Sequence, residues 1–191
     1  MTTSTKLQFI GEAIAVLLSL AYTFLYIRFS ATGGDISLVY IPAFFGSVIF
    51  MLLTWNKKIY AESALHLFYV LFAVYGYFLT SDDWRIEHTT FAQQLPFLLG
   101  GSVLVALLGY VLKSRTDAAT PYLDAFTTVF SLIATWLMLT YIHENWIYWI
   151  VIDFVAIFLY AFRKMYLASL LFVLYLIMAI DGYFDSISIF Y

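Results

Sequence analysis

The stretch Lys58-Ile-Tyr60-Ala-Glu62-Ser63, which continues through Tyr69 to Tyr75-Gly76-Tyr77, returns near the end of the chain. The second copy reads Lys164-Met-Tyr166-Leu-Ala168-Ser169 and continues through Tyr175 to Asp181-Gly182-Tyr183. A constant offset of 106 positions relates the shared Tyr, Ser, Tyr and Gly residues of the two copies. Repetition over such a length indicates that the chain contains two similar units.

Composition assigns the chain to a lipid environment. Of its 191 residues, 64% are hydrophobic and only 11% are charged, whereas soluble domains are about half apolar. There is no polar stretch long enough for a separate soluble domain, so we predict one transmembrane domain over residues 1–191. The chain has no Cys, which excludes disulfides and thiolate metal sites. It also has no basic surface pattern for nucleic acid.

Seven segments approach the length of about 20 residues that crosses a bilayer as a helix. They lie at 8–28, 38–55, 60–80, 91–112, 121–142, 146–162 and 165–185. The first segment is longer than the apolar core of a cleaved signal peptide, so we expect it to stay as a spanning helix. Long apolar runs without alternation argue against a membrane barrel.

The first and fifth segments also match, at an offset of 112. Glu12, Val16, Ser19 and Thr23 correspond to Asp124, Thr128, Ser131 and Thr135, and each set falls on one helical face. The prediction is an all-α protein with a three-helix repeat at 8–80, a linker helix at 91–112 and a second repeat at 121–185. One linker helix makes the two repeats parallel in the membrane. Membrane proteins built from such repeats are typically transporters with a site between the halves.

Basic residues predict the orientation. Seven of the nine fall on the side of the N-terminus and only Arg28 and Arg85 on the other. Because cytoplasmic loops are enriched in Lys and Arg, the N-terminus should be cytoplasmic and the C-terminus outside.

Ionisable residues inside spanning segments indicate function by default. Asp153 lies well inside the sixth segment, on one face with Trp146 and Trp149 at i, i+3 and i+7 spacing. Two indoles beside a carboxylate suit a flat, positively charged ring. The alternative for the tryptophans is an interfacial aromatic belt, which fits Trp146 best.

The third segment carries a second polar stripe of Glu62, His66 and Tyr69. These residues could bind or stack on a ligand, or Glu62 and His66 could simply neutralise each other. Asp181 takes the place of Tyr75 in the repeat, and Tyr175 takes that of Tyr69, so we include both among the candidate substrate residues. Glu12 and Asp124 lie near predicted helix starts, where a carboxylate interacts favourably with the helix dipole.

Catalytic and metal-binding motifs are absent from the sequence. We therefore expect no catalytic residues, no metal and no cofactor. An intramembrane enzyme using Glu62 with His66, or Asp153, as an acid–base pair is the alternative from another functional class.

The motif Glu144-Asn145-Trp146-Ile-Tyr-Trp149-Ile-Val-Ile-Asp153, with the two copies of the repeat, resembles the PnuC family of vitamin transporters over essentially the whole chain. This resemblance implies a 3+1+3 fold like that of SWEET sugar transporters. It also implies uptake of a nucleoside-like vitamin across the bacterial inner membrane, chiefly nicotinamide riboside, by facilitated diffusion. A cytoplasmic kinase would trap the product, and the family resemblance implies a homotrimer.

Two positions depart from the pattern that the resemblance implies for nicotinamide riboside. A Gln is expected where the chain has His66, and an Asn where it has Asp153. Glu62 with Asp153 would suit thiamine, which is also a cation, and other relatives take riboflavin. Nicotinamide riboside remains the first prediction and thiamine the alternative.

Overall fold

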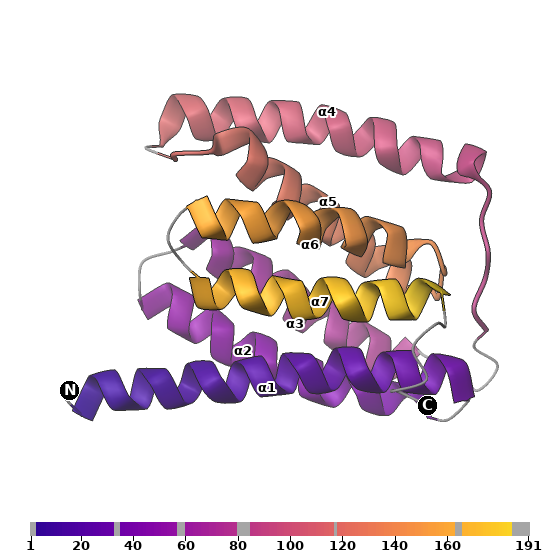
Figure 1. Ribbon diagram of the computed structural model, residues 1–191, viewed down its shortest axis with the longest axis horizontal. Helices are drawn as coiled ribbons and strands as arrows, with labels where there is room; N and C mark the ends of the chain where they lie inside the picture. Colours follow the sequence, from indigo (N-terminus) through magenta and orange to yellow (C-terminus); the bar gives the residue numbers. More distant parts are fainter. Residues whose placement is uncertain are drawn as a thin grey trace. The chain divides into compact units, whose positions relative to one another are not determined.

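The fold is described by a computed structural model that covers residues 3–32, 35–56, 60–79, 85–116, 118–162 and 166–184. Within these ranges the secondary structure is helical apart from one isolated β-bridge. The helices are α1 (Thr3–Thr32), the 3₁₀ helix η1 (Ile36–Val39), α2 (Tyr40–Asn56), α3 (Tyr60–Leu79), α4 (Phe91–Arg115), α5 (Pro121–Leu139), α6 (Asn145–Phe162) and α7 (Tyr166–Phe184) (Figure 1).

Each of the seven predicted segments coincides with one of the seven α-helices. Five helices in the described ranges are long and apolar enough to cross a membrane, and the apolar stretches Ser63–Leu79 and Ser169–Phe184 are shorter. The chain is therefore a multi-pass membrane protein.

Two differences from the predicted boundaries affect the interpretation. The fifth segment was expected to run to residue 142, but α5 ends at Leu139, and Tyr141 adopts a left-handed backbone with φ of 57°. That conformation is rare for a residue with a side chain and stops the helix. Glu12 was expected near a helix start, but α1 begins at Thr3. Glu12 therefore lies too far along α1 to interact with the N-terminal end of its dipole.

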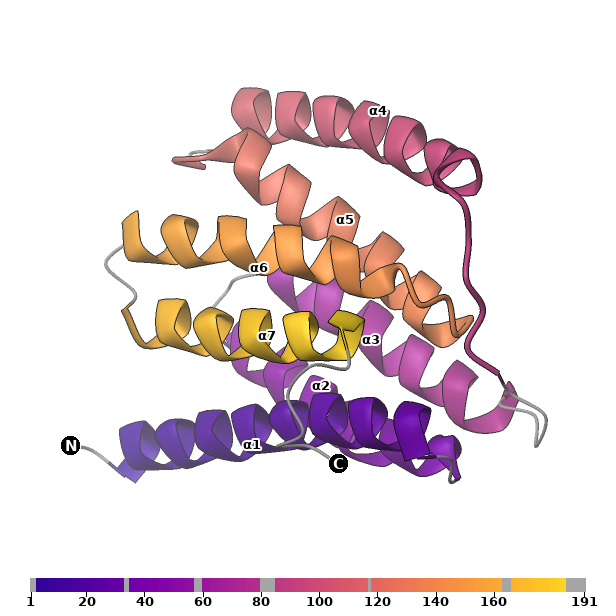
Figure 2. The ribbon, with the colours of Figure 1, turned by 45° about the vertical axis from the view of Figure 1, so that its right-hand side comes forward.

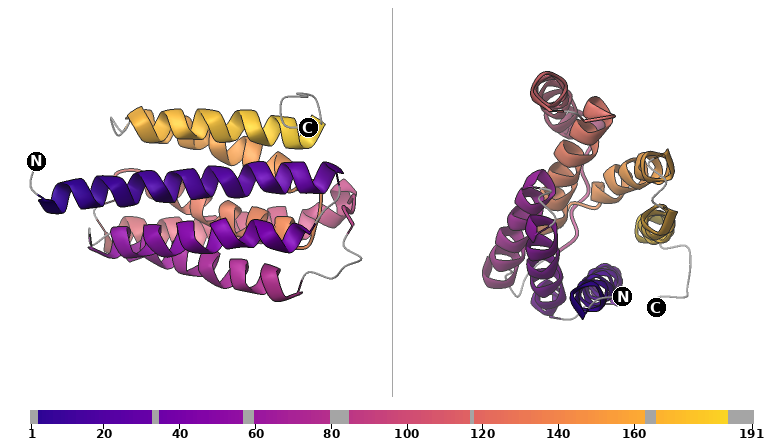
Figure 3. Two further views of the ribbon diagram at one scale, coloured as in Figure 1. Left: turned by 90° about the horizontal axis from the view of Figure 1, so that it is seen from below. Right: turned by 90° about the vertical axis from the view of Figure 1, so that its left-hand side faces the viewer.

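The chain divides into two compact units. The first contains α1, η1, α2 and α3, and the second contains α4 to α7. In the first unit α1 packs on α2 and α2 on α3 (Figure 3).

In the second unit each helix packs on the next, so α5 lies between α4 and α6, and α7 lies along α6 (Figure 2). Its core is formed by α5 and α6 through Phe130, Ala134, Leu137, Tyr148 and Ile152. Thr90 begins α4 with a capping box closed by Gln93, which satisfies backbone donors that the helix start leaves open.

The same side-chain hydrogen bond occurs in both units. Ser63 Oγ donates to the carbonyl of Met51 at 2.9 Å and joins α3 to α2. Ser169 Oγ donates to the carbonyl of Ile157 at 2.9 Å and joins α7 to α6. Donor and acceptor both shift by 106 positions between the units. This local agreement is compatible with the internal repeat seen in the sequence.

A close glycine contact also recurs at that offset. A Cβ on Gly76 would lie 2.5 Å from ring atoms of Tyr40, and one on Gly182 would lie 2.6 Å from Cε2 of Trp146. Tyr40 and Trp146 are themselves 106 positions apart. In each unit, glycine lets two helices approach across an aromatic ring.

Candidate functional site

The buried face of α6 carries polar groups without partners. Asp153 is 3% exposed, and its carboxylate has no hydrogen-bond or ion-pair partner within the described ranges. Trp149 packs against the α5–α6 core, and its Nε1 is buried without an acceptor among the described residues. An uncompensated carboxylate in apolar surroundings is costly unless a cation or a proton reaches it. Asp153 and Trp149 are therefore available to bind a polar or positively charged group.

Trp146 is placed differently from Trp149. It is 4% exposed, and its indole lies over Gly182 of α7. Asp181, the neighbour of Gly182, is fully buried at 0% exposed. The structure therefore brings Trp146 and the segment carrying Asp181 together on the α6–α7 side of the second unit, with Trp146 in a helix-packing position.

A polar network that the sequence did not predict joins the turn between α5 and α6 to α4. Thr89 donates to Glu144 Oε2 through its backbone N–H at 2.9 Å and its hydroxyl at 2.6 Å. Gln94 Nε2 donates to the hydroxyl of Thr89 at 2.6 Å, and the hydroxyl of Tyr148 donates to Gln94 Oε1 at 2.7 Å. His88 Nδ1 completes this turn network, 3.5 Å from Glu144 Oε1.

The network sets the charge state of Glu144. Partial burial by itself raises the pKa of this carboxyl, but the two hydrogen bonds from Thr89 and the nearby His88 lower it. The net effect is a pKa below the ordinary value of 4.5. Glu144 is therefore ionised at neutral pH and holds the segment before α4 against the turn before α6.

The backbone reinforces this connection. Glu87 N–H donates to the carbonyl of Tyr141, and His143 N–H donates to the carbonyl of Glu87, both at 2.9 Å. His143 Nε2 lies 3.2 Å from the carbonyl of Tyr183 on α7, and its ring lies 4.7 Å from that of His88. One end of the second unit is therefore held by contacts among residues from three separate parts of the sequence.

In the first unit, His66 is part of an aromatic group on α2 and α3. Its ring stacks on Phe50 with centroids 4.9 Å apart and meets Tyr69 edge-on at 5.7 Å. Its Nδ1 is buried without a partner in the described ranges. The predicted pairing with Glu62 lies outside what the structure describes, because the side chain of Glu62 is not described.

The second unit contains an equivalent ring pair. Phe172, which corresponds to His66 in the repeat, meets Tyr175 edge-on at 6.1 Å and stacks on Tyr160 at 5.0 Å. The edge-on contact is shared, but the stacking partners do not correspond. The polar ring atom of His66 has no equivalent in Phe172. The difference makes His66 a candidate for recognition rather than for packing alone.

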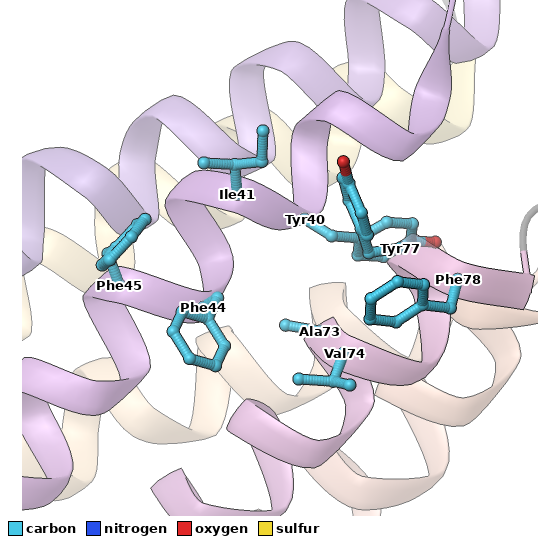
Figure 4. Close-up of a pocket in the computed structure, with 8 residues that line it drawn as sticks. All are labelled: Tyr40, Ile41, Phe44, Phe45, Ala73, Val74, Tyr77 and Phe78. Carbon is cyan, nitrogen blue, oxygen red and sulfur yellow. The ribbon is translucent and has the colours of Figure 1, made fainter.

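A pocket of about 280 Å³ lies between α2 and α3, and none of the predicted site residues lines it (Figure 4). Its lining is aromatic and aliphatic: Tyr40, Ile41, Phe44, Phe45, Ala73, Val74, Tyr77 and Phe78. A binding site for a polar ligand needs a few well-placed polar groups. This pocket has no charged residue and is not the candidate site. Among the described residues, no cluster of His, Asp and Glu could hold a metal ion.

Comparison with known proteins assigns the family. The sequence model of the family described as "Nicotinamide mononucleotide transporter" matches residues 9–187. The chain belongs to this family. A crystal structure of the vitamin B3 transporter PnuC is similar in fold, with a TM-score of 0.72 and 21% sequence identity over 92% of this chain and 79% of that one. A comparison with curated proteins gives no match.

Membership of the nicotinamide mononucleotide transporter family confirms the predicted resemblance and the all-α membrane fold. Both the family and the similar structure are named as transporters, which supports transport over the alternative of an intramembrane enzyme. The sequence did not indicate a site role for Asn145, Gln94 or Tyr148. The available signal was that Asn145 and Tyr148 lie within the motif from Glu144 to Asp153 that carries the family resemblance.

Proposed function

We propose that this protein takes up nicotinamide riboside across the bacterial inner membrane by facilitated diffusion. The observation that carries the proposal is Asp153, a carboxylate 3% exposed on α6 without a partner in the described ranges. Nicotinamide riboside carries a positively charged aromatic ring. Asp153 supplies the opposite charge, and Trp149 supplies an aromatic face for the ring.

The remaining candidate residues have distinct roles in this proposal. Tyr69 and Tyr175 contribute aromatic surface, His66 discriminates among substrates through its unpaired Nδ1, and Glu62 and Asp181 bind polar groups. Trp146 shapes the site by holding α7 against α6 at Gly182. The N-terminus faces the cytoplasm, where a kinase phosphorylates the vitamin and prevents its return.

Thiamine is the second candidate substrate. It is also an aromatic cation, and Asp153 stands where an Asn is expected for nicotinamide riboside. Both vitamins would satisfy the charge of Asp153, so the choice depends on direct measurement.

The test is uptake by proteoliposomes that contain only this protein. Radiolabelled nicotinamide riboside should enter down its gradient without ATP or an ion gradient, and Asp153→Ala should abolish uptake while the protein remains folded in detergent. Thiamine and riboflavin serve as parallel substrates. Flux of thiamine without flux of nicotinamide riboside would show that thiamine is the substrate. Recovery of a chemically altered vitamin would show that the protein is an enzyme and not a transporter.

A further inference from the structure

Asn145, the first residue of α6, is a fully buried polar residue to which the proposed function assigns no role. It is 1% exposed. Its Nδ2 donates to the carbonyl of Ile142 at 2.7 Å. This bond distinguishes the nitrogen of the side-chain amide from its oxygen, because only the nitrogen can donate to a carbonyl. The oxygen, Oδ1, is buried without a donor in the described part of the chain.

The fold does not require a polar side chain at this position. The residue 106 positions earlier is Val39, which is also fully buried at 0% exposed. The alignment of the two positions is secured by their neighbours, because Tyr40 contacts Gly76 as Trp146 contacts Gly182. One unit thus fills the position with an apolar side chain, and the other leaves a hydrogen-bond acceptor unused. Buried polar groups of this kind are normally satisfied, so the exception calls for a ligand.

Asn145, Trp149 and Asp153 follow one another at intervals of four residues on α6. Such spacing keeps them on neighbouring parts of one helical face, and eight residues cover about 12 Å along the axis. In order, the unpartnered groups are an acceptor (Asn145 Oδ1), a donor (Trp149 Nε1) and a carboxylate (Asp153). The row is comparable in length to a nicotinamide ring joined to a ribose.

We propose that Asn145 Oδ1 accepts a hydrogen bond from a ribose hydroxyl of the bound substrate, with the cationic ring held at Asp153. This inference rests on the proposed uptake of nicotinamide riboside and adds the part of the site that recognises the sugar. It makes the second unit selective for a ribosylated ring, because a ring without a sugar leaves Oδ1 unsatisfied.

The experiment measures binding of nicotinamide riboside and of three analogues, each lacking one ribose hydroxyl, to the purified full chain. The wild-type protein should bind one analogue roughly tenfold more weakly than the parent, as expected for one lost hydrogen bond. Asn145→Val, which introduces the residue of the matched position, should lose a similar factor on the parent. It should then bind that analogue and the parent equally.

Thr140→Val is the matched control. Thr140 lies at the C-terminal end of α5, before the turn that leads to Asn145, and its Oγ1 donates to the carbonyl of Trp136 at 3.0 Å. Loss of this hydroxyl perturbs the local structure but leaves Asn145 Oδ1 in place. This variant should keep the wild-type preference among the four ligands.

Three results would overturn the inference. If the wild-type protein binds all three analogues as tightly as nicotinamide riboside, no ribose hydroxyl is recognised, and the affinities of the variants do not change that conclusion. If Asn145→Val weakens all four ligands by one factor, Asn145 acts only through its bond to Ile142. If the wild-type protein does not bind nicotinamide riboside at all, the proposed function fails and this inference fails with it.

Discussion

Gly182 lies directly against the indole of Trp146, so that a Cβ at this position would stand 2.6 Å from Cε2 of the ring. Real Cβ atoms do not approach other atoms so closely, and the rigid indole cannot move aside without displacing α6 from α7. Gly76 has the same relationship to Tyr40 in the other unit. These contacts connect the packing of each unit to the first aromatic residue of α2 and of α6.

We predict that Gly182→Ala and Gly76→Ala each destabilise the protein by about 1–3 kcal/mol, the usual cost of overpacking. Gly100→Ala is the control, because nothing lies within 4 Å of the position of its Cβ. There the removal of a helical glycine should stabilise the chain by roughly 0.5–1 kcal/mol. Thermal unfolding in detergent measures all three variants. Equal changes in the melting temperature of Gly182→Ala and Gly100→Ala would contradict the close contact between Gly182 and Trp146.

The matched serine bonds lead to a second prediction. Ser63→Ala and Ser169→Ala each remove a bond between two helices, and such bonds in membrane proteins contribute about 0.6 to 2 kcal/mol. Both substitutions should lower the free energy of unfolding by similar amounts. Ser102→Ala is the control, because Ser102 Oγ donates within its own helix to Leu98 at 2.7 Å and is exposed. A loss at only one of the two serines would contradict their equivalence.

The lowered pKa of Glu144 leads to a predicted pH dependence of stability. Its pKa in the folded protein lies below the ordinary value of 4.5, so its ionised form is favoured by folding. The contribution is therefore present above the pKa of the unfolded chain and is lost as the pH falls through the lower folded value. The melting temperature of Glu144→Gln should lie below that of the wild type at pH 7, and the two should converge as the pH falls through the lowered pKa of the folded carboxyl.

Glu87→Gln is the matched control for this pH series. Glu87 is exposed and contributes to the turn through its backbone N–H and carbonyl, which the substitution leaves intact. Its melting temperature should follow that of the wild type across the pH range. A gap between the melting temperatures of the wild type and Glu144→Gln that does not narrow as the pH is lowered would show that the charge of Glu144 does not explain the effect.

Sequence reasoning was effective where a single local signal decided the structure. Apolar length located all seven helices because lipid requires helices of nearly fixed length. The offset of 106 also pointed to residues whose local contacts correspond in the two units. The end of α5 was missed because the left-handed turn at Tyr141 is not signalled by a Gly or Asn.

The turn network was beyond the reach of sequence patterns for a different reason. Thr89 and Glu144 are 55 residues apart, and Gln94 and Tyr148 are 54 apart. Periodicity describes faces of one helix and says nothing about which faces meet. Asn145 illustrates the same limit, because its sequence position indicates a helix start, while only its burial and its unused oxygen indicate a ligand.

The charge of Asp153 gives the last prediction. Nicotinamide riboside is a cation, whereas its reduced dihydro form has the same size but no ring charge. If the carboxylate acts through charge, Asp153→Asn should weaken binding of the cation by about 1.5–3 kcal/mol, or roughly 10- to 150-fold, and change binding of the reduced form much less. Asp124→Asn is the control, since Asp124 lies in the first turn of α5. Calorimetry on the purified protein measures both ligands. A similar loss for the charged and the neutral ligand would mean that Asp153 supports the shape of α6 instead of meeting the ring charge.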